Sequence, residues 1–267
     1  MSKKKQEEEA AAALLKKKKV SLTHSPILTH SPTLTHSPIH PLTHSLTHPF
    51  THSLIHSRIV SYTFLFILQL QDFLGAAQNG NISDVKKRLD EGVHATSQNE
   101  DGNTALRCAS SNGHEAVCEL LITRRCNVDM QNKGGDTALM YASSNGHKAV
   151  CELLITRGCN VDMQANNGNT ALICASRNGH EAVCELLITR RCNLDMQTNN
   201  GNTALICASA FGKIPIVISL IEAGCDYSLR NEKGKSAMDM LREKHPDKVE
   251  EVQVSRSPTA VVTHSLI

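Results

Sequence analysis

A period of 33 residues dominates the middle of this 267-residue chain. The segment NTALRCASSNGHEAVCELLITRRCNVDMQ, which starts at Asn103, returns three more times at this spacing. A hydroxyl residue marks the same point in five successive units: Thr104, Thr137, Thr170, Thr203 and Ser236. A period of roughly 20 to 50 residues predicts a stack of small units, each of which buries its apolar face only against its neighbours.

Each unit has the pattern of two helices. In residues 101–133, Gly102 belongs to a turn, and Thr104 follows at an N-cap position, where its hydroxyl can accept a backbone N–H. A first helix of about eight residues ends at Asn112, and His114 opens a second helix whose apolar residues recur at helical spacing. We place two arginines in the last turn of that helix and an extended return after it: Arg124, Arg125 and residues 127–130.

This order of elements resembles the ankyrin repeat. The resemblance lies in Gly-x-Thr-Ala-Leu, Asn-Gly-His and Glu-Leu-Leu-Ile at the length of that family, and it covers about residues 68–254. It implies an all-α repeat solenoid of helix-turn-helix units, whose β-hairpin-like turns project at right angles to the helices.

The chain departs from the family pattern after each cap. The family usually has Pro after the Thr and His two residues later, where this chain has Ala105 and Arg107. In the other units the His is replaced by Met140, Ile173 or Ile206. Because that His normally ties a helix to its loop, its absence leaves the rigidity of the loops open.

We divide the chain into three parts: a low-complexity, disordered tail at 1–61, an ankyrin repeat domain at 62–254, and a disordered tail at 255–267. Six units are expected in the domain, at about 68–100, 101–133, 134–166, 167–199, 200–232 and 233–254. The first and last are predicted caps, because polar residues replace apolar ones on their outward faces. These residues are Lys87, Arg88, Glu250 and Gln253.

Residues 21–57 repeat a Thr-His-Ser word that a simple four-base DNA repeat would encode. Whether this tail is functional, or even translated, is open. Histidines recur every four residues from His40 to His56, but Pro41 and Pro49 argue against the helix that would align them for a metal. We therefore predict disorder and no metal site.

Composition excludes several classes of partner. The formal net charge is +2, aromatic residues make up 3% of the chain and Trp is absent. These values argue against a basic nucleic-acid-binding domain and against a base-stacking platform. The apolar stretch Ile59–Leu70 is too short for the ~20 residues of a membrane helix, so we predict no membrane span and interpret it as a lead-in strand or helix that packs on the first unit.

The ten cysteines follow the repeat, and no two of them have the spacing of a zinc pair. No secretory signal is visible, so we expect reduced core thiols and a cytoplasmic protein. The clusters Lys3–Lys5 and Lys16–Lys19 leave a nuclear location open.

His114 and Cys118 have the spacing of a possible catalytic base and nucleophile, but the pair recurs in three units, which favours a packing role. We predict no catalytic residue and no cofactor.

The resemblance implies that a partner binds along a concave groove formed by the turn tips and the exposed part of the first helices. The candidate residues at these places are Asn103, Asp136, Asn169, Asn202, Arg107, Ser111, Ser144, Arg177 and Phe211. Arg177 and Phe211 are the best anchor candidates, since a few large side chains dominate most interfaces. Phe211 could instead contact the last unit, and Tyr141, which replaces core Cys108, is expected to be buried.

These observations favour a non-catalytic, monomeric adaptor or scaffold that binds another protein through this groove. A self-associating scaffold or a targeting subunit of a larger complex is the alternative, and an enzyme is a remote third. The sequence does not identify the partner or its pathway.

Overall fold

The structure is a computed structural model that describes residues 65–255, with side chains to residue 253. The predicted tails at 1–61 and 255–267 lie outside these residues, apart from Ser255. The boundaries of the domain at 62 and 254 therefore stay predictions.

Residues 65–255 contain helices and no strand, which confirms the all-α prediction. An isolated antiparallel bridge joins Gln98 and Thr104. The helices are residues 65–78, α3 (Ile82–Asp90), α4 (Ala105–Ser111), α5 (Glu115–Thr123), α6 (Ala138–Ser144), α7 (Lys148–Thr156), α8 (Ala171–Asn178), α9 (Glu181–Thr189), α10 (Ala204–Ala210), α11 (Ile214–Glu222), α12 (Ala237–Lys244), the 3-10 helix η1 (Pro246–Lys248) and α13 (Val249–Ser255).

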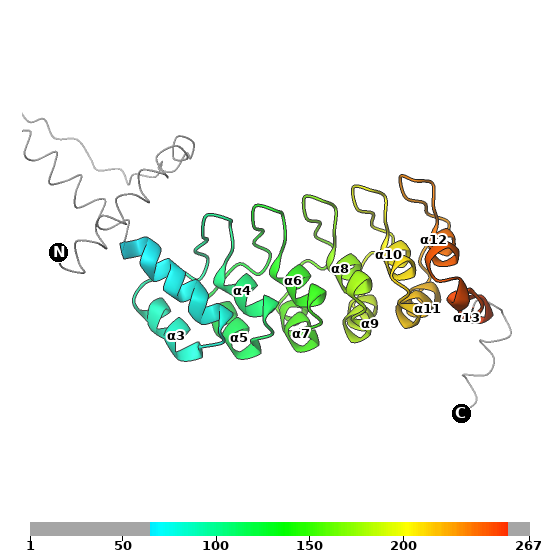
Figure 1. Cartoon of the computed structure of the whole chain (residues 1–267). Helices are drawn as coiled ribbons and strands as arrows, with labels where there is room; N and C mark the ends of the chain where they lie inside the picture. The colour runs from blue at the N-terminus through cyan, green and yellow to red at the C-terminus, as the bar shows by residue number, and fades with distance from the viewer. Residues whose placement is uncertain (1–64, 256–267) are drawn as a thin grey trace, which may run out of the picture. The chain divides into compact units, whose positions relative to one another are not determined.

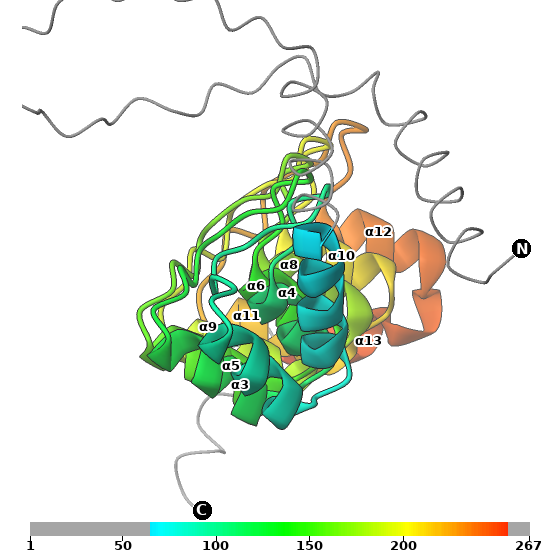
Figure 2. The same ribbon diagram turned by 90° about the vertical axis from the view of Figure 1, so that its left-hand side faces the viewer.

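These helices form two rows (Figure 1). The first helices of successive units, α4, α6, α8, α10 and α12, pack one against the next. The second helices, α3, α5, α7, α9, α11 and α13, form the other row. The loops before the first helices lie one behind another along one edge of the stack (Figure 2). This arrangement is the predicted solenoid of two-helix units.

Each first helix begins at the predicted cap. Thr104 has an extended backbone, and its Oγ1 accepts a hydrogen bond from the backbone N–H of Arg107 at 3.2 Å. The bond satisfies one of the free donors at a helix start. The same contact recurs at Thr137, Thr170, Thr203 and Ser236.

The second helices end earlier than the sequence predicts. Helix α5 stops at Thr123, Arg124 is its C-cap, and Arg125 has φ 61°. The placement of both arginines in the last turn was therefore wrong. The chain leaves the helix through a left-handed residue, a position that Gly92, Gly158 and Gly224 occupy in other units.

The return segment also differs from the prediction. It is not extended throughout, because Val128 and Asp129 form a turn. The backbone N–H of Asp129 donates to Asn127 Oδ1 at 3.0 Å. An asparagine side chain that binds the backbone two residues later is a common way to stabilise such a turn.

Side chains bind successive units together. His147 N-caps α7 without a cap bond from its side chain; instead its Nε2 lies 3.1 Å from the carbonyl oxygen of Ser111, in the unit before. Asn145 Nδ2 donates to the same carbonyl at 2.8 Å. Equivalent contacts reach the Ser144 carbonyl from His180 and Asn178.

A continuous core runs between the two rows. Its largest fully buried members include Phe73, Leu106, Leu121, Leu154, Ile173, Leu187, Ile206, Leu220 and Leu241. One buried polar pair repeats inside it: Ser110 Oγ lies 3.5 Å from Cys118 Sγ, and the next two units repeat the contact. In the unit at 200–232, Val217 takes the place of the cysteine, and Ser209 Oγ has no hydrogen-bond partner among the described residues.

The polar residues predicted for the first and last units are exposed or paired at the surface. Lys87 is exposed, and Arg88 pairs with Asp72 at 2.8 Å. Glu250 and Gln253 at the other end are exposed.

Residues 65–78 form the first helix of the first unit. Phe73 and Ala77 are fully buried, whereas Leu65–Leu68 are exposed. The predicted lead-in segment at 59–70 is thus helical where it is described, and its residues 59–64 lie outside the described part. Within residues 65–255, no helix combines the length and apolar character needed to cross a membrane.

Candidate functional site

We call the surface formed by the predicted tip and first-helix residues the groove face: Asn103, Asp136, Asn169, Asn202, Arg107, Ser111, Ser144, Arg177 and Phe211. A cavity of about 120 Å³ between α6 and α8 is lined by Asp136, Met140, Tyr141, Ser144 and Cys174. A second cavity, of about 360 Å³, joins the last two loop tips to α12. Each cavity is lined both by loop-tip residues and by residues of a first helix.

A ladder of hydrogen bonds holds the loop tips. Gln131 Nε2 donates to the carbonyl of Gly135 in its own loop at 2.7 Å, and to the carbonyl of Gln164 in the next loop at 3.1 Å. The backbone N–H of Lys133 donates to the carbonyl of Asp101 in the loop before, at 2.9 Å. Gln98, Gln164 and Gln197 repeat the glutamine contacts. These bonds fix each loop in the absence of the histidine that the family usually has.

Three of the four predicted tip residues accept hydrogen bonds from other side chains. The Oδ1 atoms of Asn103 and Asn202 accept hydrogen bonds from Asn132 and Asn231, which lie in the following loops, at 3.3 and 3.0 Å. Asn169 Oδ1 accepts from Arg177 Nη2 at 2.8 Å. The fourth, Asp136, is half-buried, and its carboxylate has no hydrogen bond or ion pair within the described part of the chain.

The two predicted serines lie at contacts between units. Asn145 Nδ2 reaches both the carbonyl and the Oγ of Ser111, at 2.8 and 3.2 Å. Asn178 Nδ2 binds Ser144 in the same way, at 2.6 and 2.9 Å. These serines help to hold the stack together, and Ser144 also lines the smaller cavity.

Arg107 covers an aromatic ring of the next unit. Its guanidinium carbon lies 4.5 Å from the centre of the Tyr141 ring, and its Nη2 donates to Cys108 Sγ at 3.5 Å. Tyr141 is half-buried, so the expectation of a buried ring was wrong. Its neighbours are polar side chains: Arg107 stacks on the ring, and Asn132 Nδ2 lies 3.5 Å from the phenol oxygen.

The side chains of the two best anchor candidates differ in burial and in hydrogen bonding. Arg177 is half-buried and held by Asn169, whereas Phe211 is the C-cap of α10 and is 53% exposed. The exposure of Phe211 favours a place on the surface over a contact with the last unit.

The sequence interpretation did not identify two of the residues that line the smaller cavity. Of its lining residues, Asp136 and Ser144 were predicted, whereas Met140 and Cys174 were not. Both occupy first-helix positions that an apolar pattern assigns to the core. A cavity between neighbouring units leaves no local signal in the sequence.

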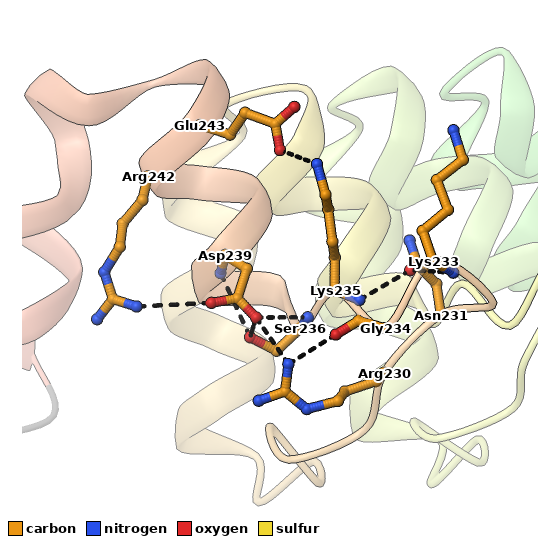
Figure 3. A network of polar contacts seen from close by, with 9 residues as sticks. All are labelled: Arg230, Asn231, Lys233, Gly234, Lys235, Ser236, Asp239, Arg242 and Glu243. Carbon is orange, nitrogen blue, oxygen red and sulfur yellow. Dashed lines mark hydrogen bonds and ion pairs between the residues drawn. The ribbon is translucent and has the colours of Figure 1, made fainter.

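The last loop and α12 give the groove face a charged end (Figure 3). Arg230 Nη1 donates to the Gly234 carbonyl at 2.7 Å and to Asp239 Oδ2 at 2.9 Å. Lys235 pairs with Glu243. The backbone N–H and the hydroxyl of Ser236 bind Asp239, and they lower the pKa of its carboxyl to about 2.

The model of the family described as ankyrin repeats, in three copies, matches residues 73–165 and 149–231. Together these matches span more than half of the chain. This protein belongs to the ankyrin repeat family. A comparison with curated proteins gives no significant match.

Among solved structures, the ankyrin chain is similar to one described as a predatory endopeptidase from Bdellovibrio bacteriovorus in complex with an immunity protein. The match has 27% sequence identity and a TM-score of 0.62. It covers 70% of this chain and 98% of the other. Ankyrin membership and this likeness agree with a role in protein–protein interaction.

The cysteines of the ankyrin units are all free, and eight of the ten are buried. Cys151, for example, is fully buried beside Ser143, and burial raises the pKa of its thiol to about 11. The preceding His147 binds the Ser111 carbonyl, so the two side chains have different partners. No group of three or more potential metal ligands occurs within residues 65–255.

Proposed function

We propose that this ankyrin chain is a non-catalytic adaptor or scaffold that binds a partner protein along its groove face. The main observation behind the proposal is that hydrogen bonds connect the loop tips of neighbouring units. Neighbouring loops are hydrogen-bonded to each other from Gln98 to Arg230. A pre-ordered surface loses less conformational freedom when it binds.

The side chains on this face support the proposal. Tyr141, Arg177 and Phe211 give three different units a large side chain at or near the surface. Aromatic and arginine side chains dominate the energetics of most protein interfaces. The solved endopeptidase–immunity protein complex also fits a binding role. We expect the chain to act as a monomer in the cytoplasm and to bind no nucleic acid.

A pull-down with the full chain tests the proposal. The double variant Arg177→Ala, Phe211→Ala should reduce capture of the partner from native lysate at least about tenfold, the effect expected when interface anchors are removed. Bound proteins are quantified by mass spectrometry, and thermal unfolding checks that the variant remains folded.

A matched control changes an arginine and an aromatic residue elsewhere. Arg157 pairs with Glu119 on the second-helix row, and Tyr227 is exposed in the return after α11. The variant Arg157→Ala, Tyr227→Ala should keep the partner. Equal capture by both double variants would reject the groove face as the binding surface. A mass above that of one chain in light scattering would favour the self-associating scaffold instead.

A further inference from the structure

We infer that the cavity between α6 and α8 receives a cationic side chain, lysine or arginine, of the partner protein. This inference rests on the proposed function and adds the chemistry of one contact to it. It depends on the charge of the cavity wall, on its size and on its lining.

The negative charge comes from Asp136. At the same tip position the neighbouring units have amides, Asn103, Asn169 and Asn202, each of which accepts an internal hydrogen bond. The carboxylate of Asp136 lines the cavity and has no such partner among the described residues. A half-buried carboxylate without a counter-ion favours a cation from outside.

The size of the cavity points to one side chain. Its volume of about 120 Å³ lies below the roughly 300–1,000 Å³ of sites that hold small molecules. The cavity also opens on the face where we place the partner protein. A single inserted residue is therefore a better fit than a metabolite.

The lining suits a long cationic side chain. Half-buried Cys174, beside buried Met140, offers apolar surface to a methylene stem, which lysine and arginine commonly bury while their charge stays near water. Tyr141 also lines the cavity, but Arg107 already stacks on its ring at 4.5 Å, so the attraction for a further cation comes from the carboxylate of Asp136. Ser144 also lines the cavity, and its Oγ accepts a hydrogen bond from Asn178.

Two arginines flank the cavity and must be considered. Arg107 belongs to α4, on the other side of α6 from the cavity, and it stacks on Tyr141. Arg177 belongs to α8 and is held by Asn169. Neither forms an ion pair with Asp136 within residues 65–253, so the carboxylate remains available. Their charges favour acidic residues in the partner on either side of the inserted cation.

Two tripeptide probes test the inference on the full chain labelled with ¹⁵N. The probes, acetyl-Ser-Lys-Ser-amide and acetyl-Ser-norleucine-Ser-amide, differ in the terminal ammonium of the central residue. The lysine probe should shift the amide signals of Asp136, Tyr141 and Cys174 with a dissociation constant about fivefold lower than that of the norleucine probe, the ratio expected for an ion pair near the surface.

Asp136→Asn should remove this preference, whereas Asp101→Asn, which removes a charge from the exposed tip of the preceding unit, should keep it. Equal binding of the two probes, no binding of the lysine probe, or a preference that survives Asp136→Asn would overturn the inference. If the pull-down shows capture that depends on Arg177 and Phe211, such a result rejects the cationic contact alone. If capture does not depend on them, the proposed function fails whatever the probes show.

Discussion

Single substitutions between otherwise similar units show what each residue contributes. The side chains of Ser110 and Cys118 form a hydrogen bond with each other inside the core. The first unit has the apolar pair Ala77 and Val85 at these two positions. The unit at 200–232 has changed only the cysteine, so Ser209 retains a buried hydroxyl without a partner among the described residues.

Ser209→Ala should therefore stabilise the chain by about 1 kcal/mol, because burying an unsatisfied polar group costs about 1–3 kcal/mol. The measurement is the free energy of unfolding in urea. Ser143→Ala is the control, because it removes a hydroxyl whose contact with Cys151 is intact, and it should give no gain. A loss of stability in Ser209→Ala comparable to that of the control would mean that the hydroxyl is satisfied in solution.

At the scale of the element, local patterns predict the helices but not the contacts that position them. Thr104 marks a helix start because capping acts within one turn of the chain, whereas His114 begins α5 without a cap bond from its side chain and contacts the carbonyl of Gln78 instead. Arg125 could not be predicted in this way, since a cation after a helix suggests pairing with the dipole, and only its φ of 61° reveals the left-handed turn.

The candidate site shows the same division. The tip residues were predicted from their place in the repeat, and Asp136 does line a cavity. The partner of Asn103 is Asn132 in the following loop, and the partner of Ser111 is Asn145 in the next unit, so a short local pattern does not reveal that these residues are already hydrogen-bonded. The stacking of Arg107 on Tyr141 was missed for this reason.

The capping box of α12 predicts a dependence on acid. Ser236 and Asp239 cap the helix reciprocally, and these bonds hold the pKa of Asp239 at about 2, below its ordinary value of 3.8. A carboxyl with a lowered pKa in the folded state stabilises above its unfolded pKa, and this contribution is lost as the pH falls through the folded pKa. Asp239→Asn should lower the melting temperature at pH 7, and the difference from wild type should shrink between about pH 4 and pH 2.

Circular dichroism melts across this pH range give the comparison. Asp247→Asn removes the same charge from an exposed residue of η1, and it should leave the melting temperature close to that of wild type at every pH. A difference for Asp239→Asn that stays constant down to pH 2 would contradict the role of its ionised form.

At the scale of the whole stack, coupling passes from one unit to the next. Gln164 Nε2 bonds the carbonyl of Gly168 in its own loop and that of Gln197 in the next, both at 3.0 Å. Stability in such an array is a sum of unit and interface contributions, so one side chain can affect two loops.

Gln164→Ala should cost about 1 kcal/mol and speed amide hydrogen exchange in both loops, at Ala165 and at Thr198. Exchange followed by NMR resolves the two sites. Thr156→Ala, at an exposed position at the end of α7, should change neither. Faster exchange confined to the loop of Gln164 would show that the ladder does not couple neighbouring units.

The junction at Ser111 has a consequence for how this protein can vary in length. Its carbonyl accepts hydrogen bonds from an asparagine and a histidine of the following unit, and the carbonyl of Ser144 accepts them from the same two residue types one unit later. Excision of residues 134–166 would therefore present Asn178 and His180 to Ser111 with matching donors. Loss of 99 nucleotides, three for each of these 33 residues, would shorten the array and keep this contact between units, but it would also remove Asp136 and Tyr141.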